Sequence, residues 1–130
     1  GVDQPHRMMI VGAGNIGRAV ALSDSFSLNG FQTVAIFDQS EKKIGMDVGG
    51  IVVQDMGQIK RYLEENPVDI AVLALPAACA QEVADQLCQY GIKGIWNFAP
   101  VDLKLPEGVA SFNVHLEEGL QVLSYRMMQA

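Results

Sequence analysis

The sequence predicts an α/β protein built on a doubly wound parallel sheet, and three observations carry this prediction. Apolar stretches of strand length alternate along the chain with stretches of helical periodicity. The first apolar stretch, residues 8–11, runs directly into the glycine pattern G-A-G-N-I-G at residues 12–17. The second, residues 33–37, ends in an aspartate. Regular alternation of strand and helix gives a parallel sheet with right-handed crossovers.

The glycine pattern is typical of a buried strand that turns sharply into a helix. Gly12 allows the tight turn, Gly14 lets a pyrophosphate approach the backbone, and Gly17 lets the helix pack against its strand. The unpaired N–H groups at the helix start would then face the phosphates. Alone, the same pattern also fits a plain tight connection, so its surroundings decide between the two interpretations.

Asp38 supplies that context, because it follows the second strand at 21 positions after Gly17. A carboxylate at this place can accept both hydroxyls of an adenine ribose and repels a 2′-phosphate, which favours NAD over NADP. The alternative is a turn residue that opens residues 38–41. Its position after both a strand and a glycine pattern favours the ribose.

Composition limits the classes of function. A chain of 130 residues with 49% hydrophobic and 18% charged residues is predicted to be one globular domain. The net charge of −6 makes this segment a poor DNA binder by itself. No stretch reaches membrane-spanning length and no signal peptide is recognised. Cys79 and Cys88 fall on opposite faces of one predicted helix, so we expect free thiols, no metal site and a cytoplasmic protein.

The remaining elements follow from periodicity and turn residues. Ala19, Leu22 and Phe26 are expected to face the sheet, and residues 23–25 form a polar break near the end of the first helix. Strands are expected at residues 7–11, 33–37, 51–53, 68–75, 92–96 and 109–114. Helices are expected at residues 15–25, around Ile59 and Leu63, at residues 77–90 before Gly91, and at residues 116–128.

The carboxyl ends of parallel strands are where ligands bind in such sheets. Pro76, just past the central strand, is therefore placed to wall a cofactor, and residues 97–100 end the next strand at the same edge. Lys42 and Lys43 have two interpretations. Both are solvated loop charges, or one of them lies along the adenosine edge of the cofactor.

The last predicted helix carries a continuous apolar stripe of Leu116, Leu120, Leu123 and Met127. Such a helix either docks on its own sheet or is buried in a partner.

Several motifs together resemble the bacterial Rex family of redox-sensing transcriptional repressors. They are V-G-A-G-N-I-G at residues 11–17, K-I-G at 43–45, A-Q-E-V-A-D-Q-L at 80–87, G-I-K-G-I-W-N-F-A-P at 91–100 and L-S-Y at 123–125. The resemblance spans about residues 8–125, and the run at 91–100 is its most distinctive part.

This resemblance implies a Rossmann-like domain at residues 7–115 that binds NADH and NAD⁺, after a linker or expression remnant at residues 1–6. It also implies a homodimer in which the helix at residues 116–130 is exchanged, and an N-terminal winged-helix domain, outside this chain, that binds operator DNA. The sequence would then be either a piece cut near Pro5 or a stand-alone paralogue. The cofactor-binding residues implied by the motifs and by the resemblance are Gly12, Ala13, Gly14, Asn15, Ile16, Gly17, Asp38, Lys43, Leu75, Pro76, Asn97, Phe98, Ala99 and Pro100.

Two positions depart from the family pattern. Residues 23–25 stand where the family usually has a tyrosine, and His115 stands where it has an aspartate. The resemblance places both family side chains in a redox-linked contact network, and this chain lacks both of them. His115 is interpreted as a capping or loop residue that could replace the missing contact in a pH-dependent way.

Two other functions fit the same fold. A dehydrogenase cofactor domain would need a proton donor and a substrate pocket, whereas His6 and His115 are the only histidines. No catalytic residue is therefore assigned. A CoA-binding module has the same layout, but Asp38 would repel the 3′-phosphate of CoA.

Overall fold

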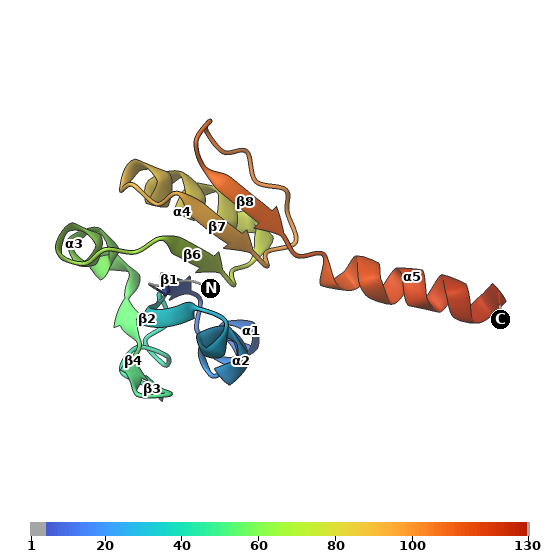
Figure 1. Ribbon diagram of the computed structural model, residues 1–130, viewed down its shortest axis with the longest axis horizontal. Coiled ribbons are helices and arrows are strands. Elements are labelled where there is room, and N and C mark those ends of the chain that lie inside the picture. Colours follow the sequence, from blue (N-terminus) through green and yellow to red (C-terminus); the bar gives the residue numbers. More distant parts are fainter. Residues whose placement is uncertain (1–4, 130) are drawn as a thin grey trace.

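The computed structural model describes residues 5–129 (Figure 1), within which the main sheet has six strands, all paired in parallel. Their spatial order is β5-β2-β1-β6-β7-β8. The chain therefore starts at the centre, builds outward through β2 and β5, returns beside β1, and builds outward again. The doubly wound prediction is confirmed, with the reversal between β1 and β6. The strands are β1 (His6–Val11), β2 (Phe31–Asp38), β5 (Gln54–Asp55), β6 (Ile70–Leu73), β7 (Gly94–Asn97) and β8 (Ala110–Asn113).

Helices cover the two faces of the sheet unequally (Figure 1). One core cluster contains Met9 and Val11 of β1 together with side chains of α3 and α4, and the other contains Met8 and Ile10 together with Val20 of α1. Successive residues of a strand point to opposite faces, which explains this division. The helices are α1 (Asn15–Ala21), α2 (Asp24–Leu28), α3 (Ile59–Glu65), α4 (Ala77–Gln89) and α5 (Leu116–Gln129), with a short 3₁₀ turn at Met56–Gln58.

The expected single helix at residues 15–25 is wrong in its second half. The chain breaks after Ala21, and Ser23 adopts an extended conformation that starts α2. Serine and aspartate favour helix starts over helix interiors, so the polar break begins a new helix. The buried face also differs from the expected one. Val20 is buried, whereas Ala19 and Leu22, expected to face the sheet, are exposed, and Phe26 is half-buried.

The strand expected at residues 51–53 is also corrected. Ile51–Val52 (β4) pairs antiparallel with Asp47–Val48 (β3) in a separate hairpin, and the third strand on this side of the main sheet is β5. Gly49 and Gly50 form the hairpin turn with φ values of +62° and +92°. Glycine pairs of this kind favour two-residue hairpin turns, which explains why the chain folds back here.

Other boundaries shift by a few residues. Strands β6 and β7 are shorter than expected, because only part of each apolar run pairs with a neighbouring strand. Gly91 follows the end of α4 with φ +99°, as predicted. The expected lead-in at residues 1–6 lies mostly outside the described residues. His6 already belongs to β1 and pairs with Phe31.

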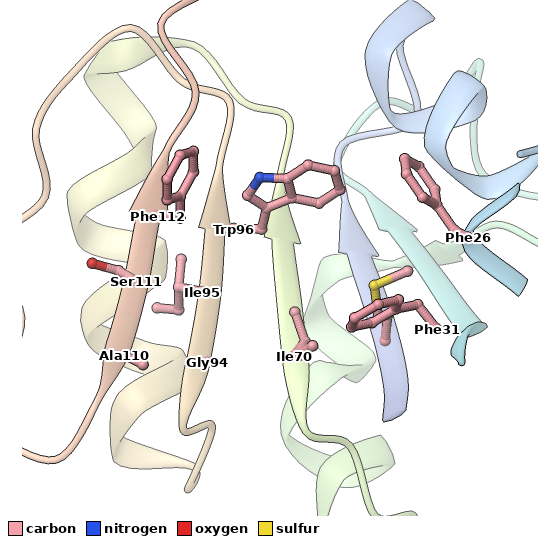
Figure 2. A pocket seen from close by; sticks show the side chains of 10 residues that line it. Phe26, Phe31, Ile70, Gly94, Ile95, Trp96, Ala110, Ser111 and Phe112 are labelled. Atoms are coloured by element: carbon pink, nitrogen blue, oxygen red, sulfur yellow. The ribbon is translucent and has the colours of Figure 1, made fainter. Parts of the chain in front are cut away.

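The face of the sheet that carries α1 and α2 is open over β6, β7 and β8 (Figure 1). It forms an apolar groove of about 430 Å³, and Figure 2 shows the rings of Phe26, Trp96 and Phe112 along it. Phe112 keeps 68% of its surface exposed. Every residue of α5 is exposed, and the helix projects away from the sheet (Figure 1). The groove is lined by Met8, Phe26, Phe31, Ile70, Gly94, Ile95, Trp96, Ala110, Ser111 and Phe112.

Candidate functional site

The glycine turn joins β1 to α1, and its three glycines have different surroundings. Gly12 has φ +107°, and a Cβ built there would lie 2.1 Å from the carbonyl oxygen of Ala74. A Cβ on Gly17 would lie 1.8 Å from the carbonyl oxygen of Gly12. A Cβ on Gly14 meets nothing within 4 Å. The predicted tight turn and close packing are therefore confirmed, and the space in front of Gly14 is open.

Asp38 lies beside this turn at the end of β2. Its Oδ2 accepts a hydrogen bond from the Ala13 N–H at 2.7 Å, and its Oδ1 accepts one from the Ser40 N–H at 2.7 Å. The second bond links the Asp38 side chain to the backbone two residues later, which is a common arrangement in turns. Asp38 is therefore a turn residue, and it also contacts the glycine turn. A carboxylate has about four acceptor positions, which leaves room for further donors.

Arg18 braces the start of α1, a role that sequence reasoning missed. Its Nη2 donates to Asn15 Oδ1 at 2.9 Å, and its Nε donates to the Gly14 carbonyl at 3.3 Å. The signal was available in the sequence, because residues three and four apart on a helix face each other. These contacts fix the predicted site residue Asn15 and place a guanidinium next to the turn.

A cavity of about 480 Å³ lies at the carboxyl edge of the sheet, next to α1. It brings together the predicted site residues Ile16, from the start of α1, and Phe98 and Pro100, from the loop after β7. The rest of its lining follows β7 and β8. Sequence reasoning missed these residues, since they carry no motif, and His115 was singled out only as a departure. They are Val101, Asp102, Val114, His115, Leu116, Glu117 and Glu118.

Asn97 stabilises the loop after β7, which lines one side of that cavity. It is 0% exposed, and it is the buried polar side chain of residues 5–129. Its Nδ2 donates to the carbonyl oxygens of Val101 at 2.8 Å and Ala99 at 3.3 Å and to Asn113 Oδ1 at 3.1 Å, while its Oδ1 accepts from the Ala99 N–H at 3.0 Å. Asn97 and the buried Ala99 therefore shape the loop after β7, and neither lines the cavity.

Three other predicted site residues lie outside the cavity as well. Leu75 packs into the core cluster that contains α3 and α4, and Pro76 is the exposed residue that precedes α4. Lys43 is half-buried in the turn after β2, and Lys42 is exposed. The structure thus groups the glycine turn with Asp38, and Ile16 with Phe98 and Pro100.

His115 lies between two carboxylates. Its Nε2 is 3.8 Å from Asp102 Oδ1 and its Nδ1 is 3.7 Å from Glu118 Oε1. These distances exceed those of hydrogen bonds but fit ion pairs once the imidazole is protonated. The residue directly precedes α5, which agrees with its interpretation as a loop residue at a helix start.

Within the described residues no group of three or more potential ligands could hold a metal ion, and no helix is long and apolar enough to cross a membrane. Cys79 and Cys88 are both free and half-buried. Burial, followed by the nearby Asp85 carboxylate, raises the pKa of the Cys88 thiol, and Lys93 opposes this rise.

The strand order, with its reversal between β1 and β6, and the glycine turn define a doubly wound domain of the Rossmann type. The family model described as the CoA binding domain matches residues 3–101. The chain belongs to this CoA binding domain family. Over nearly its whole length it is also similar to proteins named as Rex repressors.

The Rex relatives match nearly the whole chain. The redox-sensing transcriptional repressor Rex of Clostridium tetani is 46% identical over 127 residues, which cover 98% of this chain and 60% of that protein. The crystal structure of the Rex-family repressor RSP with β-NADH has a TM-score of 0.93 and 40% identity, and it covers 99% of this chain and 62% of that one. RSP with β-NAD⁺ and operator DNA matches equally well, with 59% of that chain covered. This chain spans about 60% of the length of these relatives.

Dehydrogenases share the fold alone. The WlbA dehydrogenase of Bordetella pertussis has a TM-score of 0.59 at 18% identity. The relatives that are similar in sequence are named as repressors, so the comparisons support the expectation of a non-enzyme over the alternative of a dehydrogenase domain.

Proposed function

We propose that this chain is the NAD(H)-binding domain of a Rex-type repressor, which senses the cellular ratio of NADH to NAD⁺. The observation that carries the proposal is the agreement with RSP, whose crystal structures contain NADH, or NAD⁺ and operator DNA, over 99% of this chain. The open space at Gly14 supports it independently, because a pyrophosphate needs that backbone to be free of a side chain.

The residues fit a dinucleotide that crosses the reversal of the sheet. The free amides of the glycine turn would receive the pyrophosphate, and the Arg18 guanidinium adds positive charge beside it. Asp38 would accept the adenine ribose hydroxyls with its remaining acceptor positions. The nicotinamide would enter the 480 Å³ cavity between Ile16 and Phe98, whose apolar walls suit a planar ring. Lys43 would lie along the adenosine edge.

Other residues would act through these contacts. Asn97 and Ala99 would shape the nicotinamide end by holding the loop that presents Phe98 and Pro100. Leu75 and Pro76 would close the edge after β6. None of these roles requires a catalytic group, which agrees with a sensor that binds its ligand and releases it unchanged.

Calorimetric titration with NADH, NAD⁺, NADPH and CoA separates the candidate functions. The proposal predicts that NADH binds more tightly than NADPH and CoA, because Asp38 repels the extra phosphate of each. The family model, named for CoA, favours CoA as the second candidate. Tight CoA binding without dinucleotide binding would replace the proposal with that candidate.

The unmatched apolar surfaces support a homodimer that exchanges α5. The helix carries exposed Leu120, Leu123 and Met127, and the groove beside Trp96 and Phe112 has no helix of its own. A second copy would satisfy both surfaces, because its α5 could fill the groove that this copy leaves open. Operator DNA would be bound by a winged-helix domain outside this chain, and the whole protein would act in the cytoplasm.

The dimer is tested by sedimentation velocity of the wild-type chain and of Leu123→Glu. The charged side chain would face the apolar groove, so the variant should be monomeric at a concentration where the wild type is dimeric. Gln121→Glu adds the same charge to the same helix outside the apolar stripe, and it should remain dimeric. A monomeric wild type at micromolar concentration would contradict the exchanged helix.

A further inference from the structure

The cavity proposed for the nicotinamide is acidic. Asp102 after β7 and Glu117 and Glu118 in the first turn of α5 line it, and we refer to these three residues as the acidic cluster. His115 lies inside the cluster, 3.8 Å from Asp102 and 3.7 Å from Glu118. With a neutral imidazole, the nicotinamide end therefore carries three negative charges next to the apolar walls of Phe98 and Val114.

We propose that the acidic cluster sets how this domain ranks the two oxidation states, by favouring the cationic nicotinamide of NAD⁺ and so reducing the preference for NADH. This inference rests on the proposed function and deepens it, since it names the residues that determine the redox set point of the same site.

The argument is electrostatic. NAD⁺ and NADH share the adenosine, both riboses and the pyrophosphate, and they differ in the nicotinamide, which carries a positive charge only when oxidised. Contacts at the glycine turn and Asp38 therefore contribute nearly equally to both affinities and cancel in their ratio. Charges close to the nicotinamide do not cancel, because they attract one form and leave the other nearly unaffected. The acidic cluster is the set of charges that lines this cavity.

Exposure limits the size of the effect. The side chains of Asp102 and Glu118 are 81% and 69% exposed, so water and salt screen them. Exposed charge pairs change an equilibrium constant by roughly 1.5-fold to fivefold each. The apolar walls exclude water on one side and focus the field into the cavity. We expect the removal of two carboxylates to shift the affinity ratio by roughly threefold to tenfold.

The experiment compares dissociation constants for NAD⁺ and NADH in the wild type and in the double variant Asp102→Asn/Glu118→Gln. The variant should bind NAD⁺ roughly threefold to tenfold more weakly and NADH with nearly unchanged affinity, and high salt should reduce this difference. The matched control is Glu64→Gln/Glu107→Gln, which removes two exposed carboxylates outside the cavity and should keep the wild-type ratio.

The outcomes separate the inference from the proposed function. If both dinucleotides bind but the double variant keeps the wild-type ratio, or the control shifts the ratio as much, the acidic cluster does not set the preference. If the wild type binds neither dinucleotide, the proposed function fails and this inference fails with it.

Discussion

Replacing Gly14 with alanine separates the ligand-binding role of the glycine turn from its structural role. The added Cβ would meet no atom within 4 Å, and Gly14 has a φ of −78° that alanine adopts without strain. Alanine also restricts the unfolded chain. The free energy of unfolding should therefore stay the same or rise, by up to about 1 kcal/mol.

Binding should respond in the opposite direction. The methyl group would occupy the open space that a pyrophosphate needs, which costs one charge-assisted hydrogen bond or more. Such a bond contributes about 1.5–3 kcal/mol. The dissociation constant for NADH should therefore rise roughly tenfold to a hundredfold, at about 1.4 kcal/mol per factor of ten.

The contrasting variant is Gly17→Ala, in which the new Cβ would lie 1.8 Å from a backbone oxygen. Helix α1 would have to move, so this variant should lose on the order of 3 kcal/mol of stability. Urea unfolding followed by the fluorescence of Trp96, the chain's single tryptophan, measures both stabilities, and calorimetry measures NADH binding. Wild-type NADH affinity in Gly14→Ala, with the fold intact, would refute the reasoning that the pyrophosphate lies against this backbone.

Three further predictions concern Asp38, Asn97 and Cys88. Asp38→Ala should narrow the preference for NADH over NADPH by about tenfold, because the carboxylate that repels the 2′-phosphate is gone; calorimetric titrations with an unchanged preference would contradict this. Asn97→Ala should lower the free energy of unfolding by about 2–3 kcal/mol, since it leaves buried partners at Ala99 and Val101 without hydrogen bonds, and urea unfolding at wild-type stability would show that water replaces them. The raised pKa of Cys88 means that folding favours the protonated thiol. At mildly alkaline pH its alkylation by iodoacetamide, followed by peptide mass spectrometry, should be slower in the folded than in the unfolded chain, and stability should fall as the pH rises past the ordinary thiol range. Equal alkylation rates would show that burial does not protect the thiol.

The sequence predicted the fold correctly at positions where both burial and backbone geometry restrict the residue type. Strands β1, β2 and β6 are buried on both faces, so they are continuous apolar runs, and the backbone of Gly12 and Gly17 tolerates no side chain. These features predict the doubly wound sheet and the location of its crevice.

The sequence-based predictions failed where several weak preferences for helix, turn and strand compete. Ala19 and Leu22 fit a helical stripe, but α1 ends at Ala21, a new helix begins after Ser23, and both side chains are exposed. The sequence predicted a single strand after Gly49 and Gly50, where the structure has a hairpin. Its two strands have two residues each, which is too short to show periodicity.

The candidate site was predicted in part for a similar reason. Residues 12–17 and Asp38 carry a recognisable spacing, and the structure places Ala13 and Asp38 in contact. The acidic cluster has no such spacing, because it is assembled from the loop after β7 and the first turn of α5, which only the fold brings together. Asn97 could be placed at the sheet edge because it directly follows the strand expected at residues 92–96, whereas its burial and its four hydrogen bonds depend on tertiary contacts.

A crystal structure of this chain with NADH tests the central claim most directly. The account predicts the pyrophosphate against Gly14, the adenine ribose at Asp38 and the nicotinamide in the cavity beside Phe98 and Pro100. NADH bound anywhere else, or a crevice without nucleotide at saturating NADH, would contradict it.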